Sequence, residues 1–293
     1  MKIACIILNY NDAKRTLKLA VQVSAYSAVN DVVIIDNCST DNSVSILQES
    51  SNAKIHFFQT DKNGGYGYGN NVGLKFAFGE LCADAALIVN PDVIFDNKLV
   101  DRISNALTVE PRAGVISAMQ LDADGTENHR TAWRIPTKWS YIMSTGAISS
   151  RLAKGFYYSL EYLHAKPCVQ ADCVSGSLLL ISKAAFDATG GYDERMFLYC
   201  EETTLGCKLK NVGLTAYICS DVGYYHLHGK SISRSIKSTV RLKEIMLKSH
   251  HILLKEYLKA TELELLLDTI IGKLGLTEEY VKSFIRSNFK EGS

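Results

Sequence analysis

A single acidic side chain in this sequence stands directly after a short apolar segment and a proline. Residues 85–89 are all apolar and predict a buried strand, and Pro91 ends that strand so that Asp92 lies just beyond it. In open α/β sheets, ligands and metal ions bind at this edge. A hard cation would take Asp92 as one oxygen ligand and complete its coordination with water and substrate phosphate. The alternative is an ordinary turn aspartate.

Two adjacent acids, Glu201 and Glu202, follow another apolar segment. Neighbouring residues on a helix or strand point in different directions, so the two carboxylates need not share a role. One could hold a positioning contact while the other takes a proton as a general base. The alternative is the solvent-exposed acidic start of a helix.

Other polar groups are weaker signals. Asp36 ends the second predicted strand, where a carboxylate can accept hydrogen bonds from a nucleobase or ribose, or can belong to a capping cluster. His226 and His228 could bind a metal ion or a phosphate, although most isolated histidines are ordinary surface or core residues. The glycine-rich segment 63–71 lacks the G-x-G-x-x-G spacing and follows the third strand, which argues against a nicotinamide-dinucleotide fold.

The elements that position these groups alternate regularly over the first part of the chain. Helices are predicted at residues 12–25, 39–48 (with Ser39 or Thr40 as its cap), 71–78 and 98–107. Strands are predicted at residues 3–8, 32–35, 55–58, 85–89 and 114–118. Such alternation is typical of an α/β fold with a mostly parallel, twisted sheet flanked by helices.

The second part is less regular. Residues 122–170 lack a clean period and predict a long, partly helical insertion of the kind that carries specificity, and a structured block at 173–188 follows. After residue 231 the sequence is helical, basic and amphipathic, with a capping box formed by Thr261 and Glu264 and a cap at Thr277. We therefore expect two units, residues 1–232 and a C-terminal amphipathic helical region at 233–293.

Composition restricts the function classes. The 293 residues carry a net charge of +1, which argues against a dedicated nucleic-acid binder. None of the eight cysteines forms a C-x-x-C pair, so free thiols in a reducing cytoplasm are expected. No segment has the length of a signal-peptide core or a membrane span, so the sequence predicts a cytoplasmic protein with at most peripheral membrane contact.

Taken in order, these motifs resemble family 2 glycosyltransferases of the GT-A (nucleotide-diphospho-sugar transferase) fold, especially the bacterial rhamnosyltransferase-like group. The resemblance covers about residues 1–232 and depends on the joint order of motifs that are individually weak. The motifs are the turn Leu8–Asn11, D-N-x-S-x-D-x-S at Asp36–Ser43, a glycine-rich turn at Gly65–Gly73, N-P-D at Asn90–Asp92, V-S-G at Val174–Gly176, G-G-[FY]-D-E at Gly190–Glu194, F-L-Y-x-E-D at Phe197–Glu202 and H-x-x-G-x-S at His226–Ser231.

The resemblance implies an inverting, metal-dependent transfer of a sugar from a nucleoside-diphosphate donor to a hydroxyl of a glycan acceptor. The first expectation is rhamnose from dTDP-rhamnose, added to a lipid-linked oligosaccharide in bacterial surface polysaccharide (O-antigen or capsule) synthesis, and a UDP-hexose is the next. Glu202 would be the base, and Asp92 and His226 would hold Mg²⁺ or Mn²⁺. The donor nucleotide would contact Asn9, Tyr10, Asn11, Asp36, Asn63, Gly65, Asn70 and Asn90, and the acceptor would be positioned by Asp172, Gly176 and Glu201.

Three positions depart from the family pattern. The catalytic aspartate is replaced by Glu202, which is one methylene longer, and the usual aspartate two residues later is Thr204. The D-x-D metal motif of many relatives has Asn90 in its first position, which leaves Asp92 as its only carboxylate.

Two questions stay open at this level. One is whether the chain is instead a non-catalytic nucleotide-sugar-binding protein with a structural Glu202. The other concerns the C-terminal region, where residues 230–260 hold eight Lys or Arg and two acidic residues. That composition suits peripheral docking on an anionic membrane at the inner face of the cytoplasmic membrane, but equally a helix packed on the catalytic domain or in a homodimer.

Overall fold

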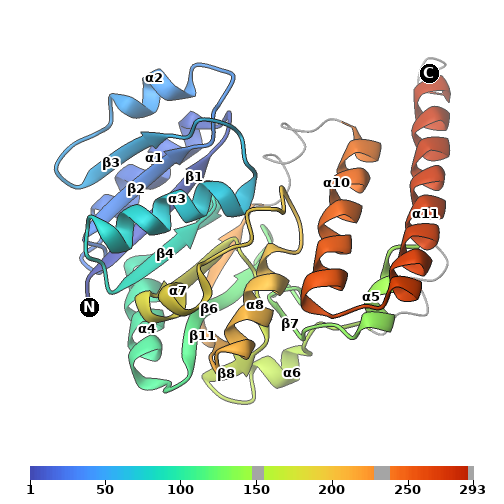
Figure 1. The fold of residues 1–293 in the computed structure, drawn as a ribbon. Helices are drawn as coiled ribbons and strands as arrows, with labels where there is room; N and C mark the ends of the chain where they lie inside the picture. Colours follow the sequence, from blue (N-terminus) through green and yellow to red (C-terminus); the bar gives the residue numbers. More distant parts are fainter. Residues whose placement is uncertain (147–154, 228–237, 290–293) are drawn as a thin grey trace.

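A nine-stranded sheet forms the centre of the protein in a computed structural model that describes residues 1–146, 155–227 and 238–289 (Figure 1). The strand order is β3-β2-β1-β4-β10-β6-β11-β5, and β8 pairs with β11. Strands β5, β8 and β10 run against the others. The strands are β1 (Ile3–Asn9), β2 (Asp31–Asp36), β3 (Ile55–Gln59), β4 (Ala85–Val89), β5 (Val93–Ile94), β6 (Ala113–Leu121), β8 (Cys168–Ala171), β10 (Leu178–Ser182) and β11 (Thr215–His226). The expected α/β fold with a mostly parallel sheet is confirmed.

Helices cover both faces of this sheet because its strands are apolar on both sides. Along β1, Ile3, Cys5 and Ile7 belong to one buried cluster, and Ala4 and Ile6 belong to the other. The first cluster packs against α1 (Ala13–Ser24), α2 (Ser43–Gln48) and α4 (Asn97–Val109). The second packs against α3 (Tyr66–Gly79), α7 (Lys183–Thr189) and α8 (Glu201–Asn211).

The irregular second part supplies central strands as well as peripheral elements. Strand β10 lies between β4 and β6 and pairs antiparallel with both. A separate two-stranded sheet joins β7 (Ala132–Trp133) to β9 (Cys173–Val174), and two short helices, α5 (Lys138–Ser144) and α6 (Leu160–Leu163), lie nearby in sequence. The predicted insertion is therefore partly helical where it is described.

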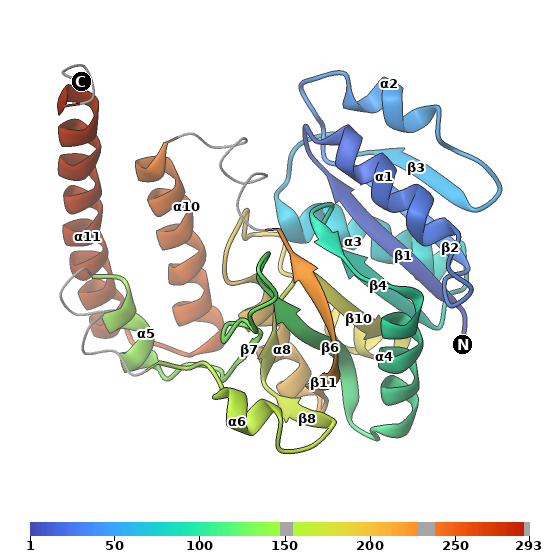
Figure 2. The ribbon, with the colours of Figure 1, turned by 180° about the vertical axis from the view of Figure 1, so that it is seen from behind.

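The C-terminal helices stand beside the sheet rather than on its faces (Figures 1 and 2). They are α10 (Thr239–Ile252), the π-helical turn η2 (Leu253–Tyr257) and α11 (Glu262–Phe289). Helix α11 packs on α10 and α5 around Ile142, Leu254 and Leu265. His250 and Asp268 are buried between α10 and α11, with Nδ1 and Oδ1 3.1 Å apart. None of the described helices has the length and apolar character needed to span a bilayer.

Several local expectations can be compared with the structure. The capping box is confirmed, because the Thr261 N–H donates to Glu264 and the Glu264 N–H donates to the Thr261 hydroxyl. The cap at Thr277 is wrong: this residue lies inside α11, where its hydroxyl donates to the Lys273 carbonyl. All eight cysteines are free thiols, as expected.

The predicted start of the second helix is also wrong. Helix α2 begins at Ser43, four residues after Ser39, because the Ser39 hydroxyl donates to Asp36 instead of capping a helix. Helix α3 begins at Tyr66, earlier than expected. Its early glycines make close contacts, and a Cβ at Gly67 would lie 2.9 Å from Tyr192.

Candidate active site

At the ends of β1 and β2, a buried carboxylate is held in a polar cluster. Asp36 Oδ2 accepts from Asn9 Nδ2 at 2.7 Å and from the Ser39 hydroxyl at 2.6 Å, and Oδ1 accepts from the Ser39 N–H at 2.8 Å. Asn9 in turn accepts from Thr16. Asp36 and Asn9 are fully buried, so their partners largely fix their side chains at this edge of the sheet.

The turn after β1 extends this cluster toward the surface. Asn11 adopts a left-handed backbone conformation with φ of 55°, and its N–H donates to the Ser39 hydroxyl at 2.9 Å. The Asn11 amide oxygen also accepts from the Thr40 N–H at 2.8 Å. Tyr10 is partly exposed beside it. Polar atoms from two loops thus meet above the strand ends, where a nucleoside could bind.

The glycine-rich turn closes against the segment that precedes the two adjacent acids. Gly65 has φ of +91°, and a Cβ there would collide with the Phe197 backbone. The next residue, Tyr66, donates its N–H to the Phe197 carbonyl at 3.0 Å. Asn37 Nδ2 ties the turn to β2 by donating to the Gly65 carbonyl and to Asn63 Oδ1, both at 3.0 Å.

Asp92 and His226 meet where β4 ends. Residues Val93 and His226 are paired in the short β5–β11 ladder, and the Leu227 N–H donates to the Asp92 carbonyl at 3.0 Å. The imidazole Nε2 lies 3.3 Å from Asp92 Oδ1, and the aspartate is 4% exposed. Burial opposes ionisation, but the hydrogen bond and charge of His226 outweigh it, so the pKa of Asp92 lies below its usual value.

These two side chains fit part of a divalent-metal site. A carboxylate oxygen suits Mg²⁺ or Mn²⁺, and an imidazole nitrogen is a common metal ligand. Within the described residues, no group of three or more His, Cys, Asp or Glu side chains could hold an ion alone. A cation held by Asp92 and His226 would therefore need further ligands from water and a bound diphosphate. His228 and the segment Gly229–Ser231 lie outside the described residues.

Glu202 contacts the loop between β9 and β10, and this loop in turn contacts the residues that follow β4. Its Oε1 accepts from the Gly176 N–H at 3.2 Å, and the Gly176 carbonyl accepts from the Tyr66 hydroxyl at 2.6 Å. The next carbonyl, of Ser177, accepts from the Asn90 N–H at 2.9 Å. Desolvation raises the pKa of Glu202, although hydrogen bonds from backbone N–H groups oppose the rise. A continuous set of contacts thus links Glu202 to the segment that carries Asp92.

Glu201 differs from its neighbour. It is 3% exposed, and its Oε1 is buried without a hydrogen-bond partner among the described residues. Burial, reinforced by the charge of Glu202, raises the pKa of Glu201 well above its usual value. Tyr199 and Cys200, which precede the pair, both have left-handed φ angles of 72° and 71°, and this backbone turns the two acids into the start of α8.

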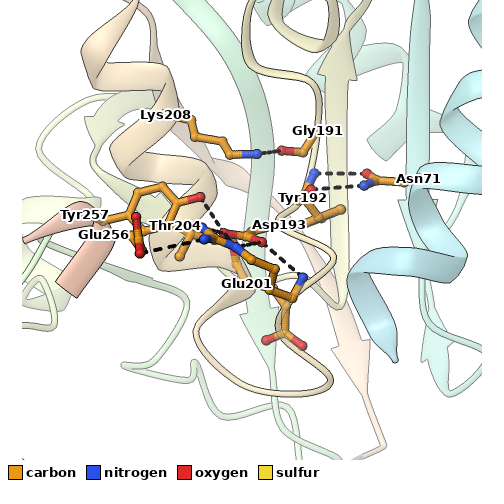
Figure 3. A network of polar contacts seen from close by, with 10 residues as sticks. Asn71, Gly191, Tyr192, Asp193, Glu201, Thr204, Lys208, Glu256 and Tyr257 are labelled. Carbon is orange, nitrogen blue, oxygen red and sulfur yellow. Dashed lines mark hydrogen bonds and ion pairs between the residues drawn. The ribbon is translucent and has the colours of Figure 1, made fainter. Parts of the chain in front are cut away.

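A second network holds the loop 190–195 that leads into this segment (Figure 3). Asn71 on α3 donates to the Tyr192 carbonyl and accepts from its N–H, and Lys208 on α8 donates to the Gly191 carbonyl. Asp193 accepts from Arg195 and from the Tyr257 hydroxyl at 2.8 Å. Burial opposes ionisation of Asp193, but the Arg195 hydrogen bonds prevail and lower its pKa to about 2. The C-terminal turn η2 is thereby tied to the loop before the two acids.

A groove of about 630 Å³ is lined in part by His226, the partner of Asp92. Its lining includes Gln120, Asp122, His129, Arg130, Ser175 and His226. Strands β6 and β11, which contribute Gln120 and His226, are on the far side of β4 from Asp36 on β2. The groove and the Asp36 cluster therefore lie on opposite sides of β4.

Comparison with known proteins identifies the family and the fold. Residues 4–168 match the family described as Glycosyl transferase family 2. The chain belongs to glycosyl transferase family 2. The N-acetylglucosaminyl-diphospho-decaprenol L-rhamnosyltransferase of Mycobacterium tuberculosis is 30% identical over 67% of this chain and 66% of its own length. The low-salt glycan biosynthesis hexosyltransferase Agl10 of Haloferax volcanii is 26% identical over 76% of this chain and 66% of its own.

A solved structure with a similar fold extends the comparison to the whole chain. The mannosyltransferase PcManGT from Pyrobaculum calidifontis, crystallised with GDP-Man and Mn²⁺, superposes with a TM-score of 0.60 at 14% identity, covering all of this chain and 76% of its own. This likeness establishes the GT-A fold. The matched regions of the two curated relatives span 66% of their lengths, just under two thirds.

Asn90, Asp172 and Asn70 are further residues that the sequence of this family 2 chain predicts for the site. Asn90 contacts the Ser177 carbonyl, as described above. Asp172 Oδ2 accepts from the Ile135 N–H at 3.0 Å and lines a small cavity with Glu202. Asn70 lies on α3 and is fully buried. Its Nδ2 donates to the Tyr66 carbonyl, so the side chain is packed within the protein rather than open to a ligand.

Sequence reasoning missed residues that connect the site. The sequence does not single out Tyr66, Ser177 or Tyr224. In the structure, the Tyr66 hydroxyl donates to the Gly176 carbonyl, and the Ser177 and Tyr224 hydroxyls lie 2.7 Å apart. The only signal in the sequence was their position beside recognised motifs: Tyr66 inside the glycine-rich turn, Ser177 after V-S-G and Tyr224 two residues before His226.

Proposed function

We propose that this family 2 protein is an inverting, metal-dependent glycosyltransferase that moves a sugar from a nucleoside-diphosphate donor to a hydroxyl of a glycan acceptor. The observation that carries the proposal is the placement of Asp92 with His226 and of Glu202 on one sheet edge, joined through the Gly176–Ser177 loop. A donor and an acceptor would approach this edge from the Asp36 cluster and from the groove.

On the donor side, the proposal assigns the nucleoside to the surface formed by Asn9, Tyr10, Asn11 and Asp36. Asn63, Gly65 and Asn70 would shape the glycine-rich wall. Since Asp36 is already bonded to Asn9 and Ser39, it would act mainly by ordering this loop, with exposed polar atoms of the Asn11–Thr40 pair meeting the nucleoside directly.

The metal and the base have separate tasks in this proposal. Asp92 and His226 would hold Mg²⁺ or Mn²⁺, which neutralises negative charge on the departing diphosphate. Glu202 would accept the proton of the acceptor hydroxyl as that oxygen attacks the anomeric carbon from the face opposite the leaving group. A carboxylate with a raised pKa is a stronger base than an ordinary glutamate, provided that the pH keeps it ionised. Glu201, Gly176 and Asp172 would position Glu202 and the acceptor.

Relatives guide the choice of substrates. The Mycobacterium tuberculosis relative is named an L-rhamnosyltransferase that acts on a diphosphate-linked lipid sugar. We therefore place dTDP-rhamnose first among donors and a lipid-linked sugar first among acceptors, in bacterial surface polysaccharide synthesis such as O-antigen or capsule. A UDP-hexose is the next donor class, consistent with the hexosyltransferase name of the Haloferax relative.

Domain and location remain part of the same proposal. Residues 1–232 would form the transferase unit and residues 233–293 a C-terminal helical region. That region would make a peripheral contact with the inner face of the cytoplasmic membrane, pack on the transferase unit, or form a homodimer contact. The basic segment behind the membrane idea lies partly outside the described residues. Vesicle co-sedimentation at low and high salt, with and without residues 234–293, separates these options.

The test is a panel of nucleotide sugars, each with and without Mn²⁺. We expect one donor class to raise the melting temperature in a metal-dependent way and to be consumed when a lipid-diphosphate N-acetylglucosamine acceptor is added. Metal-dependent stabilisation without any transfer would favour the non-catalytic nucleotide-sugar-binding alternative. Stabilisation by none of the donors would overturn the proposal.

A further inference from the structure

The groove beside Asp92 contacts both ends of the reaction centre proposed above. His226, one of its walls, is the partner of Asp92, and Ser175, another wall, precedes Gly176, which donates to Glu202. Because the groove lies across β4 from the Asp36 cluster, a donor seated on that cluster leaves it open. An acceptor bound in the groove would therefore lie next to the loop that contacts Glu202.

A row of aromatic rings extends from the groove wall. The rings of His129 and Tyr157 are 5.6 Å apart and nearly perpendicular, and those of Tyr157 and Trp133 are 6.2 Å apart. Tyr157 is 36% exposed, and His129 is also exposed. Trp133 Nε1 donates to the Thr203 hydroxyl at 3.1 Å, which anchors the end of the row to the residue that follows Glu202.

Aromatic rings beside a polar groove, two of them exposed and Trp133 half-buried, suit one kind of ligand. A sugar ring carries an apolar C–H face that packs on an aromatic ring, and hydroxyls on its rim that need polar partners. Asp122 and Asn128, which are hydrogen-bonded to each other at 2.8 Å, bring polar atoms to the groove wall. The combination of stacking face and polar rim distinguishes this surface from an apolar patch.

Arg130 adds a positive charge to the same wall of the groove. Arg130 is exposed and follows His129, and its guanidinium has no ion-pair partner within residues 1–146, 155–227 and 238–289. An arginine fork binds phosphate oxygens in a bidentate manner. Because Asp92 and His226 would serve the donor diphosphate through the metal ion, Arg130 is free to serve an anionic group on the second substrate.

We propose that His129, Tyr157 and Trp133 form the acceptor sugar platform and that Arg130 binds a diphosphate attached to the reducing end of that sugar. This inference rests on the proposed transferase function and adds the residues that select its acceptor class. It predicts an acceptor that is a glycosyl diphosphate rather than a neutral glycan.

The platform is tested with Tyr157→Leu, Tyr157→Phe and, as a matched control, Tyr280→Leu, which removes a 53% exposed tyrosine from α11. The probe acceptor is N-acetylglucosaminyl diphosphate carrying a short prenyl chain, with whichever donor the panel identifies. Tyr157→Leu should raise the acceptor KM about tenfold, with the donor KM unchanged. Tyr157→Phe, which keeps the ring, should restore it. An unchanged acceptor KM in Tyr157→Leu, or a failure of Tyr157→Phe to restore it, would overturn the platform.

The charge is tested with Arg130→Gln against Arg112→Gln, which removes an exposed arginine at the opposite end of β6. Arg130→Gln should raise the KM of the diphosphate probe about tenfold and leave that of the same sugar as a neutral methyl glycoside unchanged. Equal effects on both acceptors, or an equal effect of Arg112→Gln, would contradict the assignment.

A binding experiment separates this inference from the proposed function. Trp133 and Trp139 are the two tryptophans, so Trp139→Phe leaves Trp133 as the sole indole reporter. The diphosphate probe should change its fluorescence saturably, and Tyr157→Leu should weaken that binding. Saturable binding without transfer would support the platform and contradict the proposed transferase function. Transfer with no fluorescence change would support the transferase function and contradict the platform.

Discussion

At the scale of single residues, Glu202 is the side chain on which the proposed chemistry depends. Glu202→Gln keeps the size and the Gly176 contact but cannot accept a proton, so kcat should fall by about 10²–10⁴-fold while donor binding is retained. The measurement is steady-state turnover together with a donor-binding titration. Glu49→Gln, at an exposed site after α2, is the control. Near-normal turnover in a folded Glu202→Gln protein would assign the base elsewhere.

The pH dependence of wild-type turnover follows from the same carboxylate. Desolvation raises the pKa of Glu202, and a base works only when it is ionised, so kcat/KM should fall with acid at a higher pH than an ordinary glutamate would give. A pH profile of kcat/KM checks this. An acid limb at or below the usual glutamate pKa would contradict it.

The burial of Glu201 leads to a prediction about how stability depends on pH. Its folded pKa is raised above the unfolded value, so its contribution to stability is fully present below the unfolded pKa and is lost as pH rises through the folded pKa. Glu201→Gln removes the buried charge and should therefore stabilise the protein at pH 8 but hardly at pH 4. A gain of about 1 kcal/mol corresponds to a Tm increase of ~2–4 °C. Thermal unfolding at both pH values measures it, and an equal shift at both would point to another cause.

The sequence located acids and glycines better than the hydroxyls that connect them. Asp92 is recognisable because it follows an apolar strand, Glu202 because it follows an apolar segment, and Gly176 through the V-S-G motif of the resemblance. The Tyr66 hydroxyl contacts Gly176, 110 positions away, and the Ser177 hydroxyl contacts Tyr224, 47 positions away, and no local pattern encodes such pairings. Contacts of that kind arise only from the folded topology.

At the scale of elements, the glycine-rich turn offers a matched comparison. Gly65 has a left-handed φ and no room for a Cβ beside Phe197, whereas a Cβ at Gly79, at the end of α3, would meet nothing within 4 Å. Gly65→Ala should lower stability and displace the segment before Glu201, costing more than about 1 kcal/mol. Gly79→Ala should be neutral or stabilising by about 0.5–1 kcal/mol. Urea unfolding of both variants tests this, and equal effects would refute the argument.

The first strands and the starts of α1 and α4 were predicted closely, and the starts of α2 and α3 were not. The apolar runs of β1, β2 and β4 are buried on both faces, so their hydrophobicity is unbroken and easily read. The start of α2 depended on whether Ser39 capped a helix or bonded Asp36, and the tertiary contact prevailed. The start of α3 depended on how closely glycines could pack against Tyr192, which the sequence does not reveal.

At the scale of the whole molecule, a buried pair fastens α10 to α11. His250 and Asp268 are 3% and 4% exposed, and the imidazole also stacks on Tyr141 at 3.8 Å. Removing one partner leaves the other buried without its contact, so Asp268→Leu alone should cost about 3 kcal/mol. The double change His250→Leu with Asp268→Leu should cost less than the sum of the two single changes. Denaturant unfolding of all four proteins provides the cycle, and strict additivity would show that the pair is not coupled.

The position of β10 has a practical consequence for anyone who shortens this protein. The family match ends at residue 168, yet the strand between β4 and β6 comes from residues 178–182. A fragment cut at the end of the match would expose the flanks of two central strands to solvent, which invites intermolecular strand pairing. Such a product should precipitate on expression, whereas any useful truncation has to retain everything through β11.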